Sequence, residues 1–155
     1  EENLEGLEKY IGEAYFNFPS NTDISLRVKA SDTPVYSYQF VYEGWRNLAC
    51  ITSKKLPGVR GAWHADELFY LFSTHFLGSF REYEVIDTMT TLWSNFAKYG
   101  DPTPPETDPP IRWPRVDPAA PQSLVINSTL SLQSLWAGET IQFWRDIYSK
   151  YRRKE

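Results

Sequence analysis

Metal-binding and disulfide-forming residues are scarce in this chain of 155 residues, which has one cysteine and two histidines. Because Cys50 has no second cysteine to pair with, no disulfide can form within the chain, and a lone cysteine is most often a small buried hydrophobe. No cluster of Cys and His residues indicates a metal site, and we expect no cofactor. No apolar run approaches the roughly 18 residues that a membrane span needs.

Positive charge is also scarce. The net charge is −4 and the pI is near 5.3, so we do not expect the concentrated basic surface that nucleic-acid binding requires. The one basic run, residues 152–154, is typical of a solvated helix C-terminus. By contrast, 41% of the residues are hydrophobic and 16% are aromatic. That share is ample for the packed core of one domain, or of one part of a larger domain.

The N-terminal part predicts one helix followed by irregular structure. Aliphatic side chains recur at helical spacing over residues 1–12, with charged residues between them, which indicates an amphipathic helix. Residues 13–34 are polar and are interrupted by prolines, so we expect no regular structure for most of them. Within this segment, residues 24–29 alternate between apolar and polar and fit a short strand, although the family resemblance described below makes a helix equally possible.

The clearest strand is PVYSYQFVYEG, residues 34–44, which is rich in β-branched and aromatic residues. Alternation along a strand would place an aromatic set on one face and valines on the other. A strand that is apolar on both faces indicates a sheet that is covered on both sides. Residues 45–60 should form a loop. The aromatic set is Tyr36, Tyr38, Phe40 and Tyr42.

Three more helices are expected. One should lie within residues 61–76, and the strongest covers 82–99, where apolar residues step by three and four until Gly100. A final amphipathic helix should occupy residues 141–151.

Between the last two helices, residues 101–121 hold most of the chain's eleven prolines and predict a surface loop within the domain. We expect Ile111, Trp113 and Val116 to pin this loop to the body. Residues 123–127 predict a short strand. The strands are too few to complete a sheet, which indicates that their partners lie outside this chain.

His64 lies in the stretch GAWHADELFYLF, residues 61–72. An imidazole can act as a general base if it has a nucleophile at one ring nitrogen and an orienting carboxylate at the other. We interpret Asp66 as a cap or surface charge and Glu67 as a buried hydrogen-bonding residue, and no G-x-S-x-G nucleophile elbow occurs. From the residues alone, a structural histidine is the commoner alternative, and His75 is interpreted as one.

Five segments occur in an order shared with one enzyme family: PVYSYQF, GAWHADEL, TLWSNFAKYGDPTPP, Trp113-Pro114 with SLVIN, and FWRDIY. The second resembles the catalytic-histidine motif of type-B carboxylesterases, a family that includes cholinesterases, insect carboxylesterases and juvenile hormone esterase-like enzymes. The first is similar to the family's late core strand, and the third to its W-x-N-F-A-x-x-G-x-P-x-P segment. The last two resemble the family's C-terminal stretch and last helix, so the resemblance covers nearly all of the chain from about residue 10.

The resemblance implies an α/β fold in which residues 1–155 form the C-terminal part of a single α/β-hydrolase domain. That part would hold late core strands and packing helices and would not be a complete domain alone. Because the family's triad runs Ser, Asp/Glu, His along the chain, an upstream part of the same protein would supply the serine, the acid and the oxyanion hole. His64 would be the catalytic base, Glu67 and Gly61 would support it, and Trp63 would line the substrate gorge.

The implied function is the hydrolysis of small-molecule carboxylic esters by a Ser-His-Asp/Glu triad, as in insect detoxifying esterases, with the isolated chain inactive. The alternative is a catalytically inactive esterase-like adhesion or recognition module, and the retention of His64 in its motif favours the enzyme. An independent small binding domain is disfavoured because it would leave an aromatic strand edge unpaired. The lone Cys50 departs from secreted relatives with a late disulfide and slightly favours the cytoplasm, since the sequon at Asn127 carries little weight.

Overall fold

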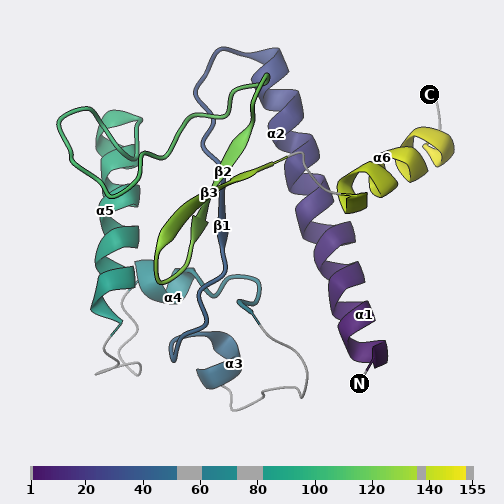
Figure 1. Ribbon diagram of the computed structural model, residues 1–155, viewed down its shortest axis with the longest axis horizontal. Coiled ribbons are helices and arrows are strands. Elements are labelled where there is room, and N and C mark those ends of the chain that lie inside the picture. The colour runs from purple at the N-terminus through teal and green to yellow at the C-terminus, as the bar shows by residue number, and fades with distance from the viewer. Residues whose placement is uncertain (1, 52–60, 73–81, 136–138, 153–155) are drawn as a thin grey trace.

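A long helical rod forms the N-terminal part of the molecule (Figure 1). It consists of α1 (Glu2–Ile11), the π-helical segment η1 (Gly12–Asn17) and α2 (Phe18–Ala30). The helix predicted over residues 1–12 is confirmed, whereas the irregular structure predicted for residues 13–23 is wrong, because the helix continues to Ala30. Of the two alternatives for residues 24–29, the helix is the one observed. This computed structural model describes residues 2–51, 61–72, 82–135 and 139–152.

The helix passes Pro19 because the proline occupies the first turn of α2. A proline in a helix interior lacks the N–H that would bond to the carbonyl four residues earlier, and its ring collides with that carbonyl. The wider π-helical turn of η1 ends directly before this point, and such turns relieve interruptions of the helical ladder. Asn21 Nδ2 adds a bond of 2.8 Å to the carbonyl of Asn17. The helix thus has a π-helical segment directly before α2 and continues past Pro19.

The sheet has three strands in the order β1 (Tyr38–Phe40), β2 (Gln122–Ile126) and β3 (Leu130–Ser134). β1 is parallel to β2, with Tyr38 opposite Leu124, and β3 is antiparallel to β2. The strand predicted over residues 123–127 is confirmed as β2. β3 was not predicted, because its sequence LSLQS is short and serine-rich.

The strand predicted over residues 34–44 is regular over only three residues. Backbone bonds nevertheless continue the pairing with β2 on both sides, because Leu124 N donates to Ser37 O and Val41 N donates to Ile126 O, both at 2.9 Å. The extended conformation is therefore longer than the strand itself.

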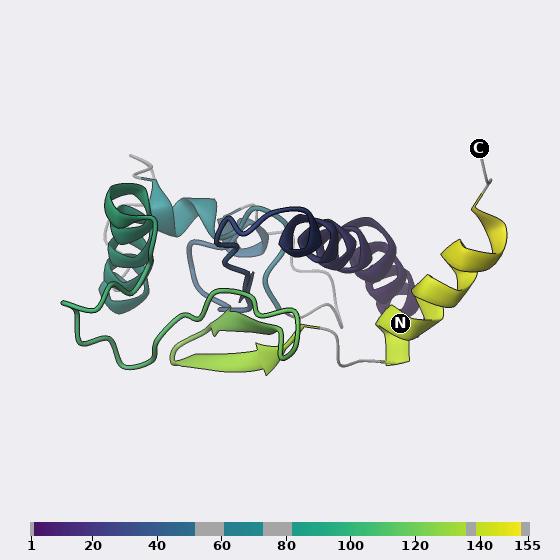
Figure 2. The ribbon, with the colours of Figure 1, turned by 90° about the horizontal axis from the view of Figure 1, so that it is seen from above.

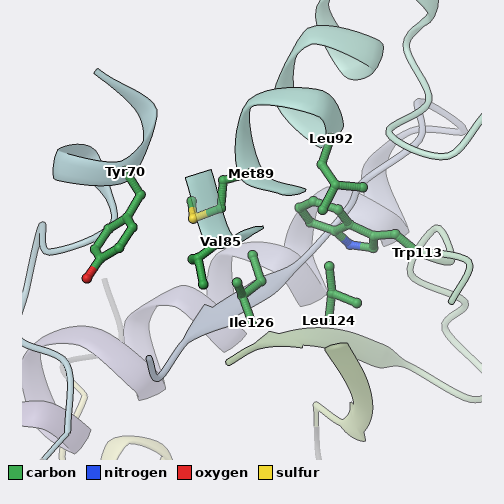
Figure 3. Close-up of a cluster of buried hydrophobic side chains, with 7 residues drawn as sticks. All are labelled: Tyr70, Val85, Met89, Leu92, Trp113, Leu124 and Ile126. Carbon is green, nitrogen blue, oxygen red and sulfur yellow. The ribbon is translucent and has the colours of Figure 1, made fainter. Parts of the chain in front are cut away.

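One face of this sheet carries the core, against α5 (Tyr83–Tyr99) (Figure 3). The helix predicted over residues 82–99 is confirmed, and it ends at Gly100, which has φ +69° and whose N–H donates to Phe96 O at 2.8 Å. A left-handed residue of this kind is the usual helix terminator. The buried side chains of the core are Tyr70, Val85, Met89, Leu92, Trp113, Leu124 and Ile126.

The proline-rich residues 101–121 have no helix or strand before β2, and they are pinned to this core as predicted. Trp113 and Val116 are buried, and Ile111 is half-buried. Trp113 Nε1 donates to Ser37 O at 2.9 Å, and its ring lies 5.9 Å from that of Tyr38. The predicted aromatic face of the strand therefore points into the core.

The opposite face of the sheet is polar and meets helices across a cavity of about 300 Å³. Buried Ser37 and Ser123 share a hydrogen bond of 3.1 Å there, and the cavity is bordered by η1, α2 and the start of α6 (Glu139–Tyr151). Figure 2 shows α6 at the end of the molecule opposite to α5. The predicted final helix is thus present, although it has no buried residue.

Two short helices complete the described chain and flank the segment around His64. α3 (Leu48–Ile51) lies where a loop was predicted. α4 (Leu68–Leu71) lies within the range predicted as helix, residues 61–76, and ends at Leu71 because Phe72 is extended. His75 lies outside the described residues.

Candidate functional site

A tight turn between residues 61 and 67 presents His64. The turn begins at Gly61, which has φ +96°, a conformation that L side chains rarely adopt. Gly61 N donates to Glu43 Oε1 at 2.7 Å, so the start of the turn is tied to the segment that follows β1. Ala65 also has a positive φ, +70°, although it is not glycine. Such a residue costs on the order of 1–3 kcal/mol and persists only where its surroundings hold it.

Asp66 is the residue that holds the turn together. Its side chain is fully buried, so the prediction of a cap or surface charge was wrong. Asp66 Oδ2 accepts from Trp63 N at 2.6 Å and from Asn47 Nδ2 at 2.9 Å, and Oδ1 accepts from Leu48 N at 2.6 Å. A buried carboxylate is tolerated where several N–H groups satisfy its oxygens.

His64 itself is exposed at the tip of this turn. Its ring centroid lies 4.8 Å from that of Phe16 in η1, with the two planes inclined by 34°. Within the described part of the chain, the imidazole has this aromatic neighbour and no hydrogen-bond partner. The sequence reading missed Phe16, because it assigned that segment to irregular structure and not to a helix that passes beside the turn.

Glu67 is half-buried and connects the turn to the sheet. Tyr38 Oη, on β1, donates to Glu67 Oε1 at 3.4 Å. Burial, and after it the charge and hydrogen bond of Glu67, raise the pKa of Tyr38 to about 12. The hydroxyl therefore stays protonated at neutral pH, so it is the donor of this bond. Glu67 contacts β1 and not the imidazole, and its role as a supporting residue stays a prediction.

A second set of buried polar groups lies behind the turn and centres on Asn47. Its Oδ1 accepts from Tyr70 Oη at 2.7 Å and from Gly44 N at 3.0 Å, and its Nδ2 also donates to Tyr42 O at 2.9 Å. Burial, followed by the charge of the buried Glu82, raises the pKa of Tyr70. The Tyr70 hydroxyl therefore stays protonated at neutral pH and can donate its hydrogen bond to Asn47 Oδ1.

Gly44 shows how closely these groups are packed. A Cβ at this position would collide with the carboxylate of Glu82 and the hydroxyl of Tyr70, so the backbone can approach these side chains only at glycine. Glu82 Oε1 accepts from Trp45 N at 2.8 Å. The loop after β1 is thus fixed at the start of α5 as well as at the His64 turn.

The remaining predicted site residue, Trp63, is half-buried and directly precedes His64. Its backbone N–H donates to Asp66, as described above, and its role as a gorge residue stays a prediction. Among the residues that the structure describes, no group of three or more His, Cys, Asp or Glu side chains could hold a metal ion. No helix in the same part of the chain is long and apolar enough to cross a membrane.

A strand, a histidine-bearing turn and helices on a sheet are parts of an α/β-hydrolase fold, and comparison with known proteins bears this out. The model of the carboxylesterase family matches residues 1–144. A crystal structure of juvenile hormone esterase from Manduca sexta superimposes with a TM-score of 0.73 at 23% identity, over 94% of this chain and 28% of that chain.

Related sequences agree with the family model. Liver carboxylesterase from Sus scrofa is 30% identical over 94% of this chain and 24% of its own length. Juvenile hormone esterase from Tribolium castaneum is 27% identical over 65% of this chain and 18% of its own length. This chain therefore belongs to the carboxylesterase family and has part of an α/β-hydrolase fold. It spans between 18% and 28% of the length of these relatives.

Proposed function

We propose that the protein to which this chain belongs hydrolyses carboxylic esters with a Ser-His-Asp/Glu triad, and that His64 is its base. The observation that carries this proposal is the position of His64. In a chain of the carboxylesterase family, a histidine is held at the exposed tip of a turn whose backbone is fixed by buried hydrogen bonds. Catalytic residues occur disproportionately on such loops, which a rigid scaffold positions.

His64 would act twice in each half of the reaction. It takes the proton from the hydroxyl of a serine, whose oxygen attacks the ester carbonyl, and the resulting imidazolium then protonates the departing alcohol. In the second half, His64 takes a proton from the water that attacks the acyl-serine, and it gives this proton to the serine oxygen as the carboxylic acid leaves. A carboxylate at the other ring nitrogen would stabilise the imidazolium.

The serine, the carboxylate and the oxyanion hole would come from polypeptide outside residues 1–155. Two features of the described chain support this part of the proposal. Asp66 and Glu67, the acids nearest in sequence, are both engaged with other donors. β1 pairs with β2 on one side, and no other described strand pairs with its second side, so its free edge suits a further parallel strand.

The test is the substitution His64→Ala in the complete protein, assayed with a p-nitrophenyl ester. We expect kcat to fall on the order of 10³-fold or more, because a serine without its base is a weak nucleophile. The control is Ser94→Ala, which changes an exposed side chain on α5 and should leave turnover near normal. Normal turnover by His64→Ala would overturn the assignment. A complete protein with no turnover before any substitution would instead favour the recognition module.

A further inference from the structure

We propose that Asp66 is a positioning residue that fixes the His64 imidazole for proton transfer without contacting it. The inference rests on the proposed function of His64 and adds a residue to that site. Asp66 is fully buried, whereas His64, two residues before it, is exposed. The turn therefore places a charge in the interior and the imidazole at the surface.

Two hydrogen bonds between Trp63 and Asp66 close a ring of residues 63–66 that includes His64. Trp63 N donates to Asp66 Oδ2 at 2.6 Å, and Asp66 N donates back to Trp63 O at 3.1 Å. The residues on either side of the short segment that carries His64 are thus joined by two bonds of opposite direction. The positive φ of Ala65 lies inside the same ring. A strained residue needs such constraint, so the ring accounts for a conformation that alanine would otherwise avoid.

The same carboxylate anchors the ring to another part of the fold. Its remaining bonds go to Leu48 N at the start of α3 and to Asn47 Nδ2. Asn47 Nδ2 also donates to Tyr42 O after β1, and Asn47 Oδ1 accepts from Tyr70 Oη on α4. The turn therefore cannot shift unless bonds to both neighbouring segments break. Because the Asp66 side chain is fully buried and bound to Trp63, Asn47 and Leu48, we assign the orienting of the exposed imidazole to another acid.

Such anchoring matters because proton transfer is sensitive to distance. A general base must lie within about 2.6–3.2 Å of the atom that it deprotonates, and a displacement of about 1 Å can cost roughly 10²-fold in rate. Looser positioning of the imidazole would slow the chemical step and leave the affinity for the ester largely unchanged. Asp66 should therefore affect kcat more than KM.

The experiment is Asp66→Asn in the complete protein. Asparagine keeps the shape of the side chain, but an amide NH₂ replaces one of the two acceptor oxygens. Because N–H donors point at both oxygens of Asp66, the NH₂ faces a donor in either orientation. We expect kcat per folded molecule to fall roughly 10²-fold, with KM within about threefold of the original. The matched control is Asp101→Asn, which alters a carboxylate that accepts a backbone bond of 2.8 Å from Thr103 N in the loop after α5. It should leave kcat within about twofold.

A double substitution separates positioning from general structural support. If Asp66 acts through His64, Asp66→Asn should cause no further loss in a His64→Ala background. An equal loss in both backgrounds would overturn the inference, and so would a normal kcat for a folded Asp66→Asn. If Asp66→Asn does not fold, Asn47→Ser removes one of the donors to Asp66 and should lower kcat roughly tenfold; an unchanged kcat there would also overturn it. Normal turnover by His64→Ala alone would instead remove the proposed function.

Discussion

At the scale of single residues, the backbone of the His64 turn depends on one glycine. Gly61 adopts φ +96°, yet a Cβ built at this position meets no atom within 4 Å. The requirement for glycine is therefore conformational and not steric. Gly44 is the opposite case, because there the surrounding side chains leave no room for a Cβ.

We predict that Gly61→Ala destabilises the protein by on the order of 1–3 kcal/mol, since alanine is strained at this φ. Gly6→Ala is the matched control, because Gly6 lies within α1 and is also free of neighbours. There alanine should stabilise by roughly 0.5–1 kcal/mol, since it loses less conformational entropy on folding. The check is the Tm of the two variants in the complete protein, by calorimetry. Equal shifts of the same sign would show that the turn tolerates a side chain.

The sequence identified the candidate base only through its motif. His64 has no local partner that marks it as catalytic, and the resemblance supplied its role. Asp66 was assigned to the surface because nothing near it in the sequence shows that Asn47 and Leu48 converge on it. Long-range donors of this kind decide whether a carboxylate is exposed or buried. Phe16 was missed for a related reason, since its contact with His64 depends on the path of a separate helix.

At the scale of secondary structure, strong periodicity was a reliable guide and proline was not. α5 and β2 closely match their predicted ranges, because the apolar pattern and the flanking Gly100 agree with the tertiary packing. Residues 13–23 were predicted as irregular because Pro19 usually breaks a helix, although η1 and α2 run through them. The predicted strand over residues 34–44 proved shorter, because its regular pairing depends on β2, far away in the sequence.

The core contribution of α5 can be tested at Met89, which is fully buried against the sheet (Figure 3). We predict that Met89→Ala lowers the free energy of unfolding by about 2–5 kcal/mol, because it removes buried apolar groups and leaves a cavity. Ser94→Ala, on the exposed side of the same helix, should change it by less than about 0.5 kcal/mol. Urea denaturation of the complete protein measures both. Similar midpoints for the two variants would mean that α5 is not part of a cooperative core.

At the scale of the whole molecule, the described chain exposes apolar surface that a complete domain would cover. The aliphatic stripe of α1 is exposed, with Leu7 at 53%, and so are Tyr15 at 66% and Phe72 at 65%. Large exposed apolar patches mark interaction surfaces. Together with the free side of β1, they fit a segment that packs against the remaining polypeptide of a longer carboxylesterase-family protein.

We propose that His64 activates a serine located outside residues 1–155, and the rate of labelling by a fluorophosphonate measures that activation. Such a probe reacts with a serine that a neighbouring base activates. Mass spectrometry of the complete protein should place the label on one serine outside this segment, and His64→Ala should slow labelling by on the order of 10³-fold. The isolated segment should remain unlabelled. A label on a residue within 1–155, or an unchanged labelling rate for His64→Ala, would contradict the account.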